Sequence, residues 1–396
     1  MPLGAGGCWD RHEMEELAWV LVLGLDQRPR QRVEVTALIA IPRRLQQDDG
    51  SGEKPFFVAS AVGDTIFDAM NLLNCYVSRR INLTHAKAVV MGMDTAEQGI
   101  QVYLDGLSRD REARRIMSVL ISHGPAGEFI RAIAPRIEAN PGKYMEELIA
   151  NRQFTGFYEP SLVHDILVAI ASPAEEPVAI RAALSEGPGR PGQETAADVG
   201  AGEVPRRGGD PVELIGGVVF SGDRAVGTLT GDEMRAVAMV RGTFRRASVT
   251  VPQPGEEEGW LALALSQRSP PRISVDLGSD PPRLRTRISL EADILMADDG
   301  FNYSGQETIV RLQQQAARVL KERIEAVVRR AQEEFQADIF GFGRHVQPHF
   351  LTWPQWQDYR WLQRFPEAVI EVEVNLEIRR IGLLFREHRP RGAETR

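Results

Sequence analysis

The stretch Arg283-Leu284-Arg285-Thr286-Arg287-Ile288-Ser289-Leu290-Glu291-Ala292-Asp293-Ile294 alternates between charged or polar and apolar side chains. A period of two is typical of a β-strand with one face on a core and the other in water. The alternation returns at residues 370–378, where five aliphatic side chains are interleaved with charged and polar ones. Two strands of this kind predict an antiparallel sheet with one dry face.

A helix is predicted between these two strands, over residues 306–336. Its apolar side chains recur at steps of three and four residues: Ile309, Leu312, Ala316, Val319, Ile324, Val327, Ala331 and Phe335. At roughly 1.5 Å per residue such a helix is about 45 Å long, enough to cover the dry face of a sheet. Residues 244–386 are therefore predicted to form a domain with an antiparallel sheet covered by one long helix, and residues 387–396 a disordered tail.

Strand-like and helix-like segments alternate over residues 9–137. The strands are predicted at 17–26, 33–41, 56–62, 85–92 and 115–122, and the helices from an N-cap at Asp64, at 97–107 and at 125–134. The first two strands are joined by a short polar turn and predict a hairpin. This order predicts a mixed α/β domain with right-handed crossovers.

A second domain is predicted over residues 138–243. Helical segments between 141 and 171 precede a strand at 178–184, a hairpin at 214–229 and a short helix at 232–241. Residues 187–211 are rich in glycine, proline and small polar side chains, which predicts a flexible insertion. The chain as a whole is predicted to have an α+β fold with three mixed α/β domains.

Composition excludes some classes of protein. The chain has 396 residues and a formal net charge of −8, which argues against a nucleic-acid-binding protein. No apolar run approaches the roughly 18–20 residues that span a bilayer. The first residues lack the basic and apolar regions of a secretory signal, so either the protein is cytoplasmic or a signal peptide precedes Met1.

Two cysteines, Cys8 and Cys75, are too few for a disulfide framework or a zinc cluster. A bond between them is one interpretation, although Cys75 falls in a predicted helix and suits a small buried side chain. A reactive thiol at Cys8 has only Arg11 as a nearby cation. A lipidated cysteine needs a small residue before it, which Gly7 supplies, and would anchor the protein without a spanning helix.

Motifs for catalysis or cofactors are scarce. Gly341-Phe342-Gly343 follows a helix and lacks the third glycine of a dinucleotide loop. His345 and His349 have the spacing of helical zinc ligands, but Pro348 interrupts the helix that would align them. The aromatic side chains Trp353, Trp356, Tyr359, Trp361 and Phe365 suit a helix packed on the sheet better than a ligand platform. No catalytic, cofactor or metal residue is predicted.

Several stretches together resemble the Ger(x)C family, the C subunit of nutrient germinant receptors of bacterial spores. The resemblance runs in register from Cys8 to about Phe385. It is carried by these segments: Gly7-Cys8-Trp9-Asp10-Arg11, Arg79-Arg80, His85-Ala86-Lys87, Pro177-Val178, Gly217-Val218-Val219-Phe220, Val226-Gly227, Phe365-Pro366-Glu367, Arg379-Arg380-Ile381-Gly382 and, most specifically, Ala337-Asp338-Ile339-Phe340-Gly341-Phe342-Gly343.

The resemblance implies a lipoprotein on the outer face of the inner spore membrane, with the lipid on Cys8. It implies a non-enzymatic subunit that assembles with a membrane A subunit and a transporter-like B subunit to trigger germination. Residues 1–8 would then be the tether, preceded by a signal peptide. The alternative is a soluble ligand-binding or metal-dependent hydrolytic protein that uses a cleft between domains, with His345 and His349 as its candidate residues.

Overall fold

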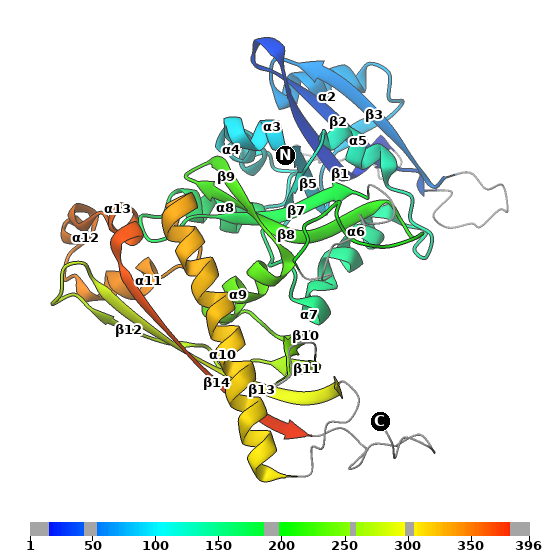
Figure 1. Ribbon diagram of the computed structural model, residues 1–396. Coiled ribbons are helices and arrows are strands. Elements are labelled where there is room, and N and C mark those ends of the chain that lie inside the picture. Colours follow the sequence, from blue (N-terminus) through cyan, green and yellow to red (C-terminus); the bar gives the residue numbers. More distant parts are fainter. Residues whose placement is uncertain (1–15, 43–53, 186–197, 254–258, 298–304, 381–396) are drawn as a thin grey trace, which may run out of the picture.

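The computed structural model describes residues 16–42, 54–185, 198–253, 259–297 and 305–380. Within these ranges the strands form a nine-stranded and a five-stranded sheet. Helices cover both sheets (Figure 1). The predicted α+β class is confirmed.

The larger sheet has the strand order β3-β2-β1-β5-β6-β7-β8-β9, with β4 paired to β1. Its strands are β1 (Leu17–Arg28), β2 (Arg32–Ala40), β3 (Phe56–Gly63), β4 (Arg80–Asn82), β5 (Ala88–Gly92), β6 (Ser118–Ser122), β7 (Val178–Leu184), β8 (Val212–Ser221) and β9 (Arg224–Leu229). Strands β1, β5, β6 and β7 run parallel, and antiparallel hairpins extend the sheet at both ends. Every residue of β5 and β6 is buried, as expected for parallel strands covered on both faces.

Two layers of helices cover this sheet. They are α2 (Ile66–Asn74), α3 (Met93–Gln98), α4 (Gln101–Arg109), α5 (Ala126–Ala132), α6 (Pro141–Ala150), α7 (Arg152–Thr155) and α8 (Val163–Ile170). Apolar side chains of α2, α4 and α8 pack on one face, and those of α5 and α6 pack on the other. The period-two strands and the amphipathic helices therefore bury each other's apolar faces.

The sheet continues across the boundary predicted at residues 137 and 138. Strand β6, from the first predicted domain, pairs with β7, from the second, and Leu120 lies opposite Ile180. The predicted hairpin from residue 214 onward is present as β8–β9 and extends the same sheet. The first two predicted domains thus share one sheet.

Two predicted helix boundaries are wrong. The N-cap of α2 is Thr65, whose hydroxyl accepts a hydrogen bond from the Asp68 N–H (3.1 Å), whereas the predicted cap Asp64 forms an ion pair with Arg32 (3.1 Å). The helix predicted at 97–107 is two helices, α3 and α4. They are separated because Gly99 has a φ of 122°, which an α-helix cannot contain.

Part of the predicted insertion at 187–211 is described, from residue 198 onward. There Val199 and Ala201 are buried beside Ile215 of β8, and Arg206 pairs with Glu213 (2.6 Å). Residues 198–211 therefore pack on the sheet, which their low apolar content did not predict. Residues 187–197 lie outside the described residues.

The five-stranded sheet is built from β10 (Arg246–Pro252), β11 (Trp260–Ser266), β12 (Arg272–Asp276), β13 (Arg283–Ala297) and β14 (Val369–Arg380). The predicted antiparallel pairing holds from β10 to β13, with β11 and β12 sharing one edge of β13. Strand β14 differs, because it pairs parallel to β13 along the other edge. The long helix between them returns the chain to the end of the sheet where β13 began.

That helix is α10 (Gln306–Arg330), continued by a π-helical turn (Ala331–Phe335). It extends along the sheet in Figure 1, and its buried face is the predicted apolar one, including Leu312, Ala316 and Ile324. Helix α9 (Gly231–Arg241) packs beside it. The core under these helices also contains Val219 of β8, so the two sheets share buried apolar contacts.

Short helices complete the C-terminal part. They are α11 (Gly343–Val346), α12 (Trp353–Tyr359) and α13 (Trp361–Arg364), with 3-10 turns at Gln347–His349 and Phe365–Glu367; a further 3-10 turn, Pro29–Gln31, joins β1 to β2. Trp356, Trp361 and Phe365 are buried in the core, which confirms that interpretation for these aromatic residues. Trp353 is half-exposed and does not follow it.

Candidate functional site

The segment that carries the family resemblance most specifically, residues 337–343, forms a turn where the two sheets meet. Residues 337–343, named here the Asp338 turn, follow the π-helical end of α10, which stops at Gln336 in a left-handed conformation (φ 51°). The carbonyl of Asp338 accepts a hydrogen bond from the Glu176 N–H (2.9 Å), two residues before β7. The turn thereby connects the long helix of the small sheet to a strand of the large one.

The carboxylate of Asp338 is fully buried and organises the turn. Its two oxygens accept five N–H groups: Oδ1 from Phe340 (3.1 Å), Gly341 (2.9 Å) and Phe342 (3.2 Å), and Oδ2 from Gly343 (2.9 Å) and the Trp361 indole (2.8 Å). Burial raises the pKa of Asp338, and the hydrogen bonds from Trp361, Gly343, Phe342 and Phe340 act in the opposite direction. The aspartate replaces the hydrogen bonds that the turn's backbone could not otherwise make.

The two glycines of the turn are needed for different reasons. Gly341 has a φ of 75°, a conformation that is strained for other residues. A Cβ on Gly343 would lie 2.3 Å from the Ala174 carbonyl oxygen and 2.4 Å from the Trp361 ring. Gly343 therefore lies where the chain is in close contact with its neighbours. The segment Gly341-Phe342-Gly343, weighed above as a dinucleotide loop, has a structural role in this turn.

Charged side chains surround the turn. Arg344 forms an ion pair with Glu175, and the Arg241 guanidinium at the end of α9 donates to the Ile339 carbonyl (2.7 Å). Glu176 accepts a hydrogen bond from the Gly222 N–H of the β8–β9 turn (2.8 Å). Burial raises the pKa of Glu176 to about 7, with the nearby Asp338 contributing in the same direction.

A second close contact joins the sheets at Gly227 of β9. A Cβ at this position would lie 2.4 Å from the ring of Phe335, at the end of the π-helical turn. The aromatic ring therefore packs directly on the backbone of the edge strand. Together with the Asp338 turn, this contact fixes the end of α10 against β7, β8 and β9.

Sequence reasoning missed the acidic and basic partners of this turn. Glu175 and Glu176 stand immediately before the quoted Pro177-Val178 segment, and Arg241 closes a predicted helix. Two adjacent acidic residues before a buried strand were the available signal. Their partners are distant in sequence, so only the fold shows what they bind.

The two histidines weighed as metal ligands lie in α11 (His345) and in the following 3-10 turn (His349). Burial lowers the pKa of His345, and the neighbouring Arg344 adds to that effect. Over the described residues, no group of three or more His, Cys, Asp or Glu side chains is arranged to hold a metal ion.

Cys8, the predicted lipid attachment residue, lies outside the described residues. Cys75 is an exposed free thiol that donates to the Asn71 carbonyl (3.5 Å). The prediction that Cys75 is buried is wrong, because the last turn of α2 points this residue away from the sheet. Among the described residues, none of the helices is long and apolar enough to cross a bilayer.

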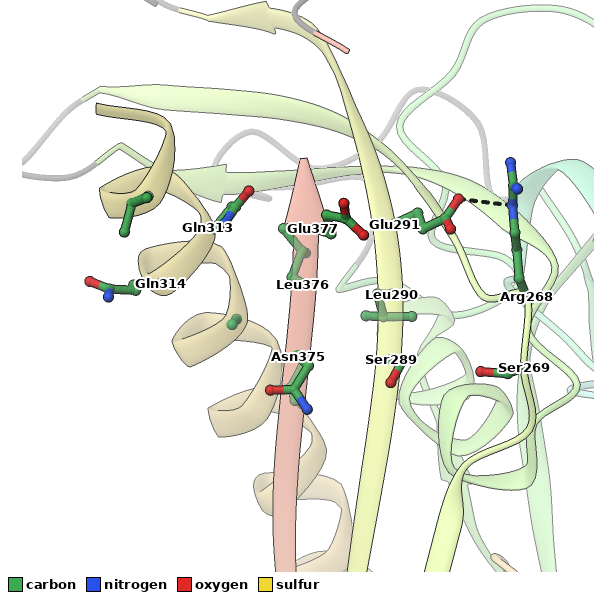
Figure 2. Close-up of a pocket in the computed structure, with 13 residues that line it drawn as sticks. Arg268, Ser269, Ser289, Leu290, Glu291, Gln313, Gln314, Asn375, Leu376 and Glu377 are labelled. Atoms are coloured by element: carbon green, nitrogen blue, oxygen red, sulfur yellow. Dashed lines mark ion pairs between the residues drawn. The ribbon is translucent and has the colours of Figure 1, made fainter. Parts of the chain in front are cut away.

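Two of the cavities that lie away from the turn have volumes of 460 Å³ or more. One, of 460 Å³, lies between the first half of α10 and the strands β13 and β14. Gln313, Asn375 and Leu376 are among its lining residues (Figure 2). The Gln313 side chain accepts the Ile378 N–H at the open edge of β14 (3.1 Å). The other cavity, of 680 Å³, lies between the β1–β2 hairpin, α2 and α4. Neither contains a triad or a metal cluster among its described lining residues.

Comparison with known proteins identifies the class of protein. Residues 10–183 match the family model described as the spore germination protein N-terminal domain, and residues 215–382 match the one described as spore germination B3/GerAC-like, C-terminal. The chain belongs to this family of spore germination proteins.

Individual relatives are similar in sequence over nearly the whole chain. It is 24% identical to the putative spore germination protein YfkR of Bacillus subtilis, over 96% of this chain and 94% of that protein. It is 23% identical to spore germination protein KC of the same organism, over 95% and 92%. The crystal structure of the GerBC protein matches with a TM-score of 0.55 at 15% identity, covering 90% and 96% of the two chains, which shows that the fold is shared.

Proposed function

We propose that this protein is a non-enzymatic, lipid-anchored subunit of a nutrient germinant receptor of bacterial spores, needed to trigger germination. The observation that carries the proposal is the match to both family models, in order, over residues 10–183 and 215–382. The geometry of the Asp338 turn supports a structural subunit, because its buried carboxylate is engaged by five N–H donors and has no free face for a substrate.

The proposed attachment residue is Cys8, with the protein held on the outer face of the inner spore membrane. The support is the segment Gly7-Cys8-Trp9, with a small residue before the cysteine. The first described strand begins nine residues later, at Leu17, so a lipid on Cys8 would lie close to the folded body. Diacyl anchoring holds a protein at a membrane without a spanning helix.

The proposed partners are a membrane A subunit and a transporter-like B subunit. This proposal follows from the family, whose members include proteins named spore germination protein KC, A3 and B3. We propose no nucleic-acid partner, because the net charge of −8 disfavours binding to a polyanion. Assembly with membrane subunits would place the protein next to the site where nutrients are sensed.

The test is Cys8→Ala, expressed in spores behind a natural lipoprotein signal sequence. We expect the variant to leave the membrane fraction and germination in nutrients to slow strongly, while germination by a receptor-independent trigger is unchanged. Cys75→Ala is the matched control, because it removes the other thiol and leaves the tether intact. Retention of Cys8→Ala in membranes together with normal nutrient germination would refute the anchoring proposal.

A further inference from the structure

A polar cavity on the water-facing side of the five-stranded sheet is distinct from the Asp338 turn. It has a volume of 410 Å³ and is named here the arginine pocket. Its lining residues come from β10, β11, β13 and β14 and the segments beside them: Arg245, Arg246, Ala264, Ser266, Arg268, Glu291, Ala292, Asp293, Arg379 and Arg380. Five of these ten residues are arginines.

Strand register places these side chains in adjacent rows. Arg246 lies opposite Ser266, which in turn lies opposite Glu291. Two residues after Glu291 in β13, Asp293 lies opposite Arg380 of β14. The small side chains of β11 leave the space, and the arginines of the outer strands surround it.

A bulge in β14 brings two consecutive arginines to the pocket. The pairing of β13 with β14 shifts register between Ala292, opposite Ile378, and Asp293, opposite Arg380, so Arg379 is the extra residue. In a regular strand, consecutive side chains point to opposite faces. The bulge changes this rule locally, and both Arg379 and Arg380 line the pocket.

Glu291 orients two of the arginines. One of its oxygens pairs with the Arg268 Nε (2.8 Å), drawn as a dashed line in Figure 2, and the other with Arg379 Nη2 (2.7 Å). Both oxygens of Glu291 are thus occupied. Arg246 and Arg380 form no ion pair or hydrogen bond with a described side chain, and they remain available for a ligand.

The charge of the pocket is opposite to that of the protein. Five arginines against two carboxylates, Glu291 and Asp293, give a local charge of +3. The whole chain carries −8. The guanidinium group presents a planar fork of donors that matches the oxygens of phosphate, and a multivalent anion best balances several excess cations.

We infer that the arginine pocket binds a phosphate-type oxyanion, either a free phosphate group or the headgroup of an anionic phospholipid. Arg246 and Arg380 supply the free donors, and Arg268 and Arg379 are held in place by Glu291. The site does not depend on the anchoring proposal, because none of its residues is near Cys8 in the sequence. Its failure would leave the proposed receptor role unaffected.

The test uses the full chain with Cys8→Ser in every sample, so that no lipid on residue 8 contributes. Binding of inorganic phosphate is measured by calorimetry at constant ionic strength, and binding to phosphatidylglycerol vesicles is measured by co-sedimentation against phosphatidylcholine vesicles. We expect one saturable site for at least one probe. We expect Arg246→Gln with Arg380→Gln to weaken that binding at least about tenfold.

The matched control is Arg272→Gln with Arg283→Gln. It removes two arginines from the same face of the sheet, outside the pocket, and has the same net charge as the pocket variant. Unchanged near-ultraviolet circular dichroism establishes that both variants are folded. Binding of inorganic phosphate that only the pocket variant loses supports a free phosphate ligand, and vesicle binding lost in the same way supports a lipid headgroup. No saturable binding of either probe, or equal weakening in both variants, overturns the inference.

Discussion

The Asp338 turn and the outer face of β13 and β14 both rely on charged side chains, in opposite surroundings. The Asp338 carboxylate is fully buried and accepts five N–H groups. On the outer face, Arg285 pairs with Glu371 (2.8 Å) and Arg287 with Glu373 (2.9 Å), all of them substantially exposed. A buried charge is costly once its partners are lost, whereas water replaces the partner of an exposed one.

The comparison therefore predicts a gradient of stability effects from the turn outward. Substitutions at the turn should unfold the junction of the sheets, and substitutions on the outer face should change little.

The largest effect is expected for Asp338→Ala. It leaves several buried N–H groups without an acceptor, so we expect the free energy of unfolding to fall by at least about 3 kcal/mol. Chemical denaturation measures the change, with the exposed Asp358→Ala as the control, expected within about 0.5 kcal/mol of wild type. Similar midpoints for the two variants would show that the buried carboxylate does not hold the turn.

The next effect is steric and is expected for Gly343→Ala. Its new Cβ would meet the Ala174 carbonyl oxygen at 2.3 Å, and the displacement should cost about 2–3 kcal/mol. Gly124→Ala is the control, because a Cβ there meets no atom within 4 Å. Thermal unfolding compares the two, and an equal change in both would show that the close contact at Gly343 does not set the cost.

A smaller effect should depend on pH through Glu176. Its pKa is raised to about 7 in the folded protein, so the folded state holds a proton that the unfolded state releases above about pH 4.5. The contribution of protonated Glu176 to stability is therefore fully present below about pH 4.5 and is lost as pH rises from about 4.5 to 7, by about 1–2 kcal/mol after allowance for solvent contact.

Glu176→Gln tests this dependence, since glutamine cannot ionise. We expect the difference in unfolding free energy between the variant and wild type to change over that pH window and to be constant above it. A difference that stays constant from pH 4.5 to 8 would mean that Glu176 titrates normally.

The smallest effect is expected at the Arg285–Glu371 pair. Both side chains are roughly half-exposed. A double-mutant cycle with Arg285→Gln and Glu371→Gln should give a coupling of about 0.2–1 kcal/mol that weakens in salt. A coupling as large as the effect at Asp338 would remove the distinction between buried and exposed charge.

Local structure followed from the sequence where a repeat of two or 3.6 residues was strong. The alternation in β13 and β14 and the apolar stripe of α10 predicted their burial, because side-chain direction in these elements follows residue number. Alternation does not encode strand direction, so the parallel pairing of β14 was missed. A helix about as long as the strand it follows was the available clue.

Long-range pairing was harder to predict. The hydrogen bonds between β6 and β7 cross more than fifty residues of helix and loop, and no local pattern reports them. In the sequence, the Asp338 turn stood out only through its two glycines and through the family resemblance of residues 337–343. The contacts that hold its conformation involve the indole of Trp361 and the carbonyl of Ala174, which lie outside the turn and could not be predicted from it.

The place of β1 in the larger sheet has a mechanical consequence under the proposed anchoring. An extended chain spans at most about 3.3–3.6 Å per residue, so a lipid on Cys8 would keep Leu17 within about 30 Å of the bilayer surface. Leu17 opens a strand that is hydrogen-bonded on both edges, to β2 on one side and to β4 and β5 on the other. Any force transmitted through the tether would reach an interior strand rather than an edge strand, and hydrogen bonds on both sides of β1 would distribute that force over the sheet.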